Sequence, residues 1–231
     1  MAAIECRSLR RDYVRGEETI HTLQDVDLDI ESGSFVALMG PSGSGKTTLL
    51  NLLAGIDRPT AGSIRIDGRE VAGLGRSTLA AWRSSTVGYV FQLYNLVPVL
   101  TAYENVELPL LLHPLKAAER HARVAEALAM VGLADRHRHY PRQLSGGQEQ
   151  RVAIARAIVT QPRLLLADEP TGDLDRASAA QVMDLLARLN RERGQTIVMV
   201  THDPSTAARA ARTVQLDKGK IVDAVVHGSA A

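Results

Sequence analysis

The pattern of apolar and polar positions predicts strands and helices in alternation. Val26 to Ile30 alternate apolar and acidic side chains, which is typical of a strand with one buried face. After a turn at 31–33, the run from Phe35 to Met39 is apolar throughout, as in a fully buried strand. Thr47 to Ala54 then carries leucines at helical spacing, and Gly55 is placed to end that helix. A strand, a glycine-rich loop and a helix in this order indicate an α/β fold.

The rest of the chain is predicted to pass through a helical lobe and return to α/β. The pattern predicts a hairpin at Ser63 to Gly68, a strand from Thr86 to Phe91, helices over 116–131 and 148–159, a strand from Leu164 to Ala167, a helix ending at Gly194, and a strand from Thr196 to Thr201. The small residues Gly228 to Ala231 are expected to fray. We therefore expect one core that is interrupted by a lobe and then resumed.

Composition narrows the class of protein. The 231 residues are 45% hydrophobic and 23% charged, enough to bury a core of one large domain. The net charge is only +1, and the 23 arginines and 4 lysines are spread along the chain, so we expect no nucleic-acid partner. A single cysteine, Cys6, excludes an internal disulfide framework. Without a secretory signal or a run of 18 apolar residues, a cytoplasmic chain with no direct membrane insertion is expected.

The glycine-rich loop after the buried strand matches G-x-x-x-x-G-K-[ST]. Its residues are Gly40, Pro41, Ser42, Gly43, Ser44, Gly45, Lys46 and Thr47. Backbone N–H groups of such a loop cradle phosphate oxygens at a helix N-terminus, while Lys46 reaches the β/γ-phosphates and Thr47 the Mg²⁺. Thr48 is the next expected nucleotide contact. The alternative is an ordinary glycine-rich turn.

Two further segments carry candidate chemistry. The apolar strand from Leu164 ends in Asp168-Glu169, where Asp168 would hold Mg²⁺ and Glu169 would orient or deprotonate the attacking water. The alternative there is a solvated acidic strand end. Ser145, Gly146, Gly147 and Gln148 precede a predicted helix and can present a second anion cradle. A plain helix N-cap at Ser145 explains the same residues equally well.

Together, the phosphate loop, Leu144 to Gln148 followed by Arg151, and Asp168-Glu169 resemble the ATP-binding cassette (ABC) family over nearly the whole chain. The resemblance implies a P-loop NTPase (RecA-like) core with an antiparallel β subdomain and an inserted α-helical subdomain. It implies one domain over 1–231, in which 1–91 and 162–231 are mainly core and β subdomain. Residues 92–161 would then hold the glutamine loop and the helical subdomain with the signature motif. ATP and Mg²⁺ are the implied cofactors.

The resemblance also implies an ATP-dependent, head-to-tail homodimer. Each ATP would lie between the phosphate loop of one subunit and the Ser145 segment of the other. Gln92 resembles the glutamine that touches Mg²⁺ and water, His202 the switch histidine at the γ-phosphate, and Tyr13 the aromatic that stacks on adenine. An exposed strand end and a structural histidine are the alternatives for Gln92 and His202. Residues 172–175 match the loop that crosses the dimer interface, ending at Asp175, although close relatives often have Asn where this chain has Asp173.

Within the family, the segments 90–98, 104–109 and 168–172 resemble the macrolide-export, lipoprotein-release and cell-division subgroup. This implies a peripheral subunit on the cytoplasmic face of the inner membrane that drives a separate integral membrane permease in export or extraction. An ATP-driven mechanical coupler of division machinery is the alternative. The apolar side chains of the loop after Gln92 either dock a cytoplasmic helix of the partner or pack into the lobe, and both remain open; they are Leu93, Leu96, Val97, Val99 and Leu100.

Other functional classes, and the remaining candidate residues, have less support in the sequence. A DNA-repair relative would need a long coiled-coil insertion, yet only 99 positions separate Lys46 from Ser145. A translation-type relative usually carries two cassettes. Arginines interleave the histidines of 136–139, which favours a solvated loop over a metal site. Cys6, placed ahead of the first strand, and Trp82, taken as an anchor of the small hairpin, are interpreted as structural.

Overall fold

The computed structural model describes residues 2–227, and Gly228 to Ala231, expected to fray, lie outside the described residues. Two compact units make up the chain. Unit 1 comprises the residues up to Arg83 together with those from Ala187 onward, and unit 2 comprises Ser84–Leu186. The subdivision at 92 and 161 that the family resemblance implies stays a prediction.

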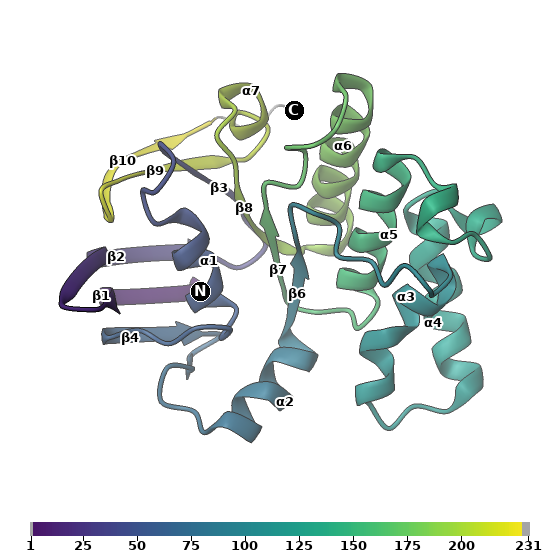
Figure 1. The fold of residues 1–231 in the computed structure, drawn as a ribbon, viewed down its shortest axis with the longest axis horizontal. Coiled ribbons are helices and arrows are strands. Elements are labelled where there is room, and N and C mark those ends of the chain that lie inside the picture. The colour runs from purple at the N-terminus through teal and green to yellow at the C-terminus, as the bar shows by residue number, and fades with distance from the viewer. Residues whose placement is uncertain (1, 228–231) are drawn as a thin grey trace. The chain divides into compact units, whose positions relative to one another are not determined.

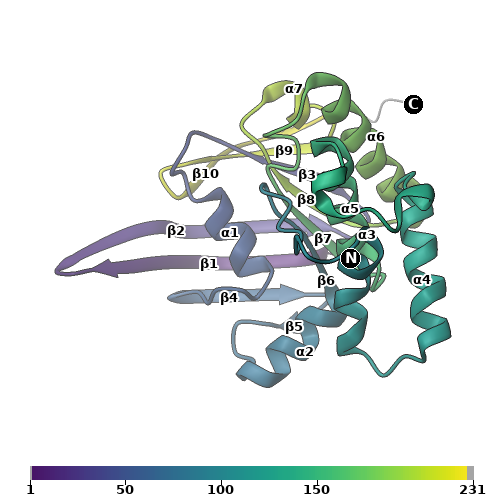
Figure 2. The ribbon, with the colours of Figure 1, turned by 45° about the vertical axis from the view of Figure 1, so that its right-hand side comes forward.

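An antiparallel sheet forms one layer of unit 1. Strands β1 (Ala2–Arg15) and β2 (Glu18–Glu31) form a long hairpin, β4 (Ala61–Ile66) pairs with the other edge of β1, and β5 (Arg69–Glu70) follows (Figures 1 and 2). The second half of β2 alternates buried and exposed side chains, which buries Val26, Leu28 and Ile30. Gly16, with a positive φ of 62°, lies in the hairpin turn. The predicted alternation is thus confirmed, within a longer strand.

The second sheet of unit 1 contains the fully buried strands. β3 (Phe35–Met39) lies between β8 (Thr196–Val200) and β9 (Arg212–Asp217), parallel to both, and β10 (Lys220–Val226) closes the order β10-β9-β3-β8. Every side chain of β8 is buried, as the apolar run predicts. The helices are α1 (Lys46–Leu53), α2 (Arg76–Thr86), α6 (Arg176–Arg193) and the short α7 (Pro204–Ala207). The last turn of α2 and most of α6 belong to unit 2.

Unit 2 combines a parallel strand pair with helices. β6 (Val87–Val90) pairs with β7 (Leu164–Asp168), with Val90 opposite Ala167. The helices α3 (Ala102–Glu107), α4 (Ala117–Met130) and α5 (Gly146–Ile158) contact one another (Figure 1). Short 3-10 turns lie at Leu108–Leu112, Ala134–Arg136 and Pro141–Gln143. Fully buried Asn105 hydrogen-bonds the backbone at Val97, Leu100 and Thr101 and so anchors the loop before α3.

The structure corrects the interpretation of Cys6 and locates Trp82. Cys6 lies inside β1, where it is fully buried opposite Leu28 and Ile64, not ahead of the first strand. The apolar period of β1 is hidden because its pairing is irregular at several points and its exposed positions carry arginine. Trp82 lies on α2 and packs near Gly55, just after α1, while its expected anchoring of the small hairpin stays a prediction.

Candidate functional site

The glycine-rich loop connects β3 to α1 and leaves no room for a side chain at its first position. A Cβ on Gly40 would lie 2.0 Å from the carbonyl oxygen of Leu216 and 2.9 Å from Ser44 Oγ. The φ of Gly40 is 152°, and Gly45 at the other end of the loop has φ 99°. Only glycine fits both the contact and the backbone angle at position 40. The sequence motif is therefore a geometric requirement of this loop.

The start of α1 offers donors for an anion. Its N-cap, Gly45, has no side chain to accept the first N–H groups of the helix, and such groups at a helix N-terminus are suited to binding an anion. Lys46 is only 7% exposed, and its Nζ donates to the carbonyl oxygens of Gly40 and Pro41, each at 2.8 Å. The ammonium thus lies along the loop that holds it. Backbone N–H groups and an ammonium are the donor set that a polyphosphate requires.

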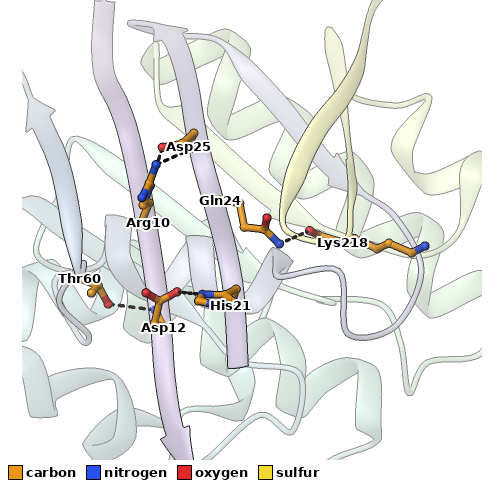
Figure 3. A network of polar contacts seen from close by, with 7 residues as sticks. All are labelled: Arg10, Asp12, His21, Gln24, Asp25, Thr60 and Lys218. Atoms are coloured by element: carbon orange, nitrogen blue, oxygen red, sulfur yellow. Dashed lines mark hydrogen bonds and ion pairs between the residues drawn. The ribbon is translucent and has the colours of Figure 1, made fainter. Parts of the chain in front are cut away.

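The hairpin and the loop are connected through Gly219. The Gly219 N–H donates to the Ser44 carbonyl at 3.1 Å, and the Gln24 N–H donates to the Gly219 carbonyl at 2.8 Å. Gln24 Nε2 also reaches the Lys218 carbonyl at 3.3 Å (Figure 3). These bonds tie strand β2 to the phosphate-binding loop within unit 1.

Tyr13, expected to stack on adenine, belongs to a polar cluster on the hairpin. Its hydroxyl donates to Asp57 Oδ2 at 2.7 Å, and Arg11 donates to the same oxygen at 2.8 Å. The Arg11 guanidinium lies 4.3 Å from the centre of the Tyr13 ring, while 38% of Tyr13 stays exposed. Burial opposes the charge of Asp57, but hydrogen bonds from Tyr13, the Arg58 N–H and Arg11 outweigh it, so the pKa of Asp57 is lowered.

Cross-strand contacts hold the hairpin around Tyr13. Asp12 pairs with His21 at 2.8 Å, and the Asp12 N–H donates to Thr60 Oγ1 at 2.9 Å (Figure 3). Arg10 binds Asp25 through two nitrogens at 2.6 and 2.8 Å. The Asp12–His21 and Arg10–Asp25 contacts join β1 to β2 at positions just before Tyr13.

His202 lies at the same sheet edge as the phosphate loop. Strands β3 and β8 are parallel with Leu38 opposite Val200, and the Thr201 N–H donates to the Leu38 carbonyl at 3.1 Å. Both strands therefore end together, one before Gly40 and the other before His202. The next residue, Asp203, caps α7, and hydrogen bonds from Thr206 and Ser205 lower its pKa to about 2. His202 is thus held between a strand and a capped turn.

In unit 2, the structure brings Gln92 and Glu169 together. A Cβ on Gly172 would lie 3.4 Å from Glu169 Oε2 and 3.5 Å from Gln92 Nε2, so both side chains approach the same glycine. They arrive there because β6 and β7 are parallel and end side by side. Glu169 has a φ of 44°, in the left-handed region that glutamate rarely adopts. Backbone strain of this kind is concentrated at functional sites.

Asp168, the last residue of β7, is the expected metal ligand. Burial, and to a lesser extent the charge of Asp168, raises the pKa of Tyr89. Within residues 2–227, no group of three or more His, Cys, Asp or Glu side chains gathers to hold a metal. The expected donors, Thr47, Gln92 and Asp168, are hard oxygen ligands, and Mg²⁺ takes few of these from protein because it also binds phosphate oxygens.

Ser145 is the N-cap of α5. Its Oγ accepts from the Gln148 N–H at 3.3 Å, and Gln148 Oε1 accepts from the Ser145 N–H at 2.9 Å. Close packing also requires the two glycines: a Cβ would lie 2.9 Å from the Tyr94 hydroxyl at Gly146 and 2.7 Å from Ser178 Oγ at Gly147. The capping interpretation is confirmed locally, while binding of a second subunit's nucleotide stays a prediction.

Asp175 caps the start of α6. Its carboxylate accepts from the Ala177 N–H at 2.9 Å, the Ser178 N–H at 3.0 Å and the Ser178 hydroxyl at 2.6 Å. These bonds lower the pKa of Asp175. Its expected nucleotide contact stays a prediction, as does that of Thr48.

Three residues near the site were not anticipated from the sequence. Arg11 and Asp57 support Tyr13, and Gln150, fully buried in α5, donates from Nε2 to the Pro170 carbonyl at 2.7 Å. A single polar residue in a sequence carries no periodic signal, so its tertiary partner is visible only in the fold.

The apolar loop after Gln92 is largely exposed. Leu93 is 69% and Val99 76% exposed, and Val97 is also exposed, whereas Leu96 and Leu100 are half-buried. Arg156 of α5 donates to the carbonyls of Tyr94 and Asn95 at 2.7 and 2.6 Å, which holds the loop backbone against the helix. Leu93 and Val99 therefore keep most of their side-chain surface exposed. None of the helices in residues 2–227 has the length and apolar character to cross a membrane.

The fold and its anion-binding loop define a P-loop nucleotide-binding protein, and comparison with known proteins identifies its family. Residues 23–172 match the ABC transporter family. The chain is 46% identical to the lipoprotein-releasing system ATP-binding protein LolD of Geobacter metallireducens, with 95% of this chain and 97% of LolD covered. It is 53% identical to the macrolide export ATP-binding/permease protein MacB 1/2 of Paracoccus denitrificans, with 95% of this chain covered. The chain therefore belongs to the ABC transporter family, as one of its ATP-binding cassettes.

The structural comparison agrees with this assignment. The dimeric ATP-binding cassette MJ0796, in a post-hydrolysis state bound to ADP and Pi, matches with a TM-score of 0.90 and 42% identity over 98% of this chain and 99% of that chain. The predicted P-loop fold and the resemblance to the macrolide-export and lipoprotein-release subgroup are confirmed. The chain spans about a third of the length of the MacB relatives, 33% in the case of the Paracoccus protein.

Proposed function

We propose that this chain binds ATP with Mg²⁺, hydrolyses it, and so drives a membrane permease that exports or extracts a substrate. The convergence of Glu169 and Gln92 on Gly172 carries the proposal, because a phosphate loop alone supports binding without hydrolysis. The relatives described above are named for macrolide export and lipoprotein release, which favours transport over a division coupler without transport.

Each residue has a role in the proposed reaction. The N–H groups of the loop and Lys46 bind the phosphates, and Tyr13 stacks on adenine. Thr47, Gln92 and Asp168 would hold Mg²⁺, which neutralises charge on the β and γ oxygens when bound. Glu169 accepts a proton from a water molecule while the oxygen of that water forms a bond to the γ-phosphorus. The bond between the γ-phosphorus and the oxygen that bridges it to the β-phosphate breaks, so ADP leaves. His202, at the same edge as the loop, donates to the γ-phosphate.

The proposed assembly is an ATP-dependent, head-to-tail homodimer. MJ0796 is dimeric in its solved structures, and its subunit covers nearly the whole of this chain. One chain carries one phosphate loop and one Ser145 segment, which such a dimer pairs across two nucleotides. The exposed Leu93, Val97 and Val99 form the proposed contact with an integral membrane permease. Through this contact, the chain is proposed to lie on the cytoplasmic face of the inner membrane.

The variant Glu169→Gln tests the proposed hydrolysis. The amide keeps the shape of the side chain but does not accept the water proton, so turnover should fall by on the order of 10² or more. ATP affinity should stay close to wild type, because the phosphate loop is unchanged. Steady-state phosphate release and equilibrium ATP titration measure the two quantities. Glu192→Gln, at an exposed glutamate near the end of α6, is the matched control. Equal loss of binding and turnover in folded Glu169→Gln would exclude the assigned role.

A further inference from the structure

The first turns of α5 contact the segment 170–181 at three points within unit 2. Gln150 Nε2 donates to the Pro170 carbonyl at 2.7 Å, and Arg151 Nη1 donates to Gln181 Oε1 at 2.5 Å. Gly147 also packs against Ser178, the residue that Asp175 binds in capping α6. The helix that begins at the Ser145 segment therefore contacts both the start of the loop that follows Glu169 and the first turns of α6.

The hydrogen bond from Gln150 reaches Pro170, the residue directly after Glu169. Glu169 has its left-handed φ of 44° directly before Pro170. On one side, the Gly172 N–H closes the turn by donating to the Glu169 carbonyl at 3.0 Å. On the other side, the Gln150 amide fixes the carbonyl of Pro170. A conformation that glutamate disfavours persists only where surrounding bonds hold it, and Gln150 supplies the one side-chain bond that reaches the Pro170 carbonyl among the described residues.

Gln150 is a poor choice for stability alone. The residue is fully buried, yet no donor within residues 2–227 reaches its Oε1 atom. An unsatisfied buried oxygen opposes folding, whereas a leucine or methionine of similar volume would bury no polar atom there. The glutamine at position 150 is therefore better explained by its bond to the Pro170 carbonyl than by a gain in stability.

We propose that Gln150 is a positioning residue for Glu169, which couples the Ser145 end of α5 to the hydrolytic carboxylate of the same chain. This assignment rests on the proposed function of Glu169. In the proposed dimer, Ser145 faces the nucleotide held by the second copy, while Glu169 serves the nucleotide held by its own chain. The link through Gln150 and Pro170 then lets closure at one ATP site set the position of Glu169 at the other.

Gln150→Leu in the full chain tests the link, and Gln150→Met provides a second apolar variant. Loss of the amide should lower kcat by roughly tenfold or more, because a small misplacement of a reacting group is costly. The ATP dissociation constant should change by less than about threefold, since no phosphate-binding group is altered. Asn105→Leu is the control: it removes another fully buried amide from the same unit, but one whose bonds go to residues 97–101. It should leave kcat within about twofold of wild type.

A double variant separates positioning from a general structural effect. In the Glu169→Gln background there is no carboxylate to place, so adding Gln150→Leu should leave the residual hydrolysis rate unchanged. The same fold loss in both backgrounds, unchanged kcat in Gln150→Leu, or failure of both apolar variants to fold would overturn the proposal. If Glu169→Gln itself hydrolyses ATP normally, the proposed role of Glu169 fails, and the role of Gln150 fails with it. If Glu169→Gln is inactive and Gln150→Leu is fully active, only the role of Gln150 fails.

Discussion

Asp57 accepts the Tyr13 hydroxyl and an Arg11 nitrogen at one oxygen, and these bonds restrict the ring that is proposed to stack on adenine. In Asp57→Ala the ring gains freedom that it must lose again when ATP binds. Ordering one such side chain weakens binding by roughly threefold to tenfold. We therefore expect ATP affinity, measured by calorimetric titration, to fall by that factor. Asp25→Ala removes an exposed ion pair from the same hairpin and should leave the affinity unchanged; equal losses in both variants would contradict the role of Asp57.

Cys6 gives a prediction about alkaline pH. Burial raises the pKa of its thiol from 9.0 to about 12, so the folded chain keeps the proton over a range in which the unfolded chain loses it. Ionisation therefore stabilises the unfolded state as pH rises above 9, by about 1.4 kcal/mol at pH 10. Urea unfolding at pH 7 and pH 10 should show this loss in the wild type, and Cys6→Val should lose less stability over the same interval. An identical pH dependence in the two proteins would show that the buried thiol does not matter.

Some candidate site residues are predicted by a pattern in the sequence, and others are not. Lys46 and Thr47 could be predicted as candidates because they belong to a glycine motif with fixed spacing. Asp168 and Glu169 could be predicted as candidates because they lie at the end of an apolar strand. Asp57 and Gln150 could not, because each is a lone polar residue whose partner lies far away in the chain. The left-handed backbone of Glu169 was equally hidden, since no glycine or asparagine marks it.

At the scale of elements, helix α5 tests the proposed dimer. Its N-cap, Ser145, would approach the γ-phosphate of ATP bound to a second copy, so Ser145→Arg would place a bulky side chain in that contact. In the Glu169→Gln background, ATP should produce a dimer and ADP mainly a monomer. Adding Ser145→Arg should abolish the ATP dimer while monomer binding stays nearly intact, because Lys46 is untouched. Light scattering with parallel nucleotide titrations measures both.

Two results would contradict the proposed role of Ser145 in the dimer. A dimer that persists in the Ser145→Arg variant, or loss of monomer ATP binding in a folded chain, would leave Ser145 as a helix cap only. Loss of the cap also lowers stability by about 1 kcal/mol, so thermal unfolding is measured beside the dimer. A folded variant with normal binding and no dimer is the expected outcome.

Strands that are buried along their whole length could be predicted from their apolar runs. Strands with both buried and exposed side chains, and very short helices, could not. β3, β7 and β8 are apolar runs, and their predicted bounds agree with the structure to within one residue. β1 was missed because its pairing is irregular and its outward positions carry arginine. The short α3 was hidden as well, because its helical signal is a capping box of Thr101 and Glu104 with only two turns behind it. β9 and β10 follow a polar stretch and lack a strong turn motif other than Lys218-Gly219.

For the whole molecule, attachment to a membrane should require a protein partner. The chain has a net charge of only +1. Each basic residue near an anionic surface contributes only about 1 kcal/mol, so a balanced surface gives little affinity for lipid. The exposed Leu93, Val97 and Val99 are therefore proposed to meet a permease and not the bilayer.

Flotation with anionic liposomes at low and physiological salt measures this directly. The purified chain should stay at the bottom of the gradient in both conditions, with and without ATP. Val99→Asp places a charge in the exposed apolar loop and serves as the matched variant, which should behave identically, with unchanged ATPase activity. Salt-sensitive flotation of the wild type would show electrostatic binding to lipid headgroups. Salt-independent flotation that Val99→Asp abolishes would instead show that the loop inserts into lipid, and either result would remove the need for a protein partner.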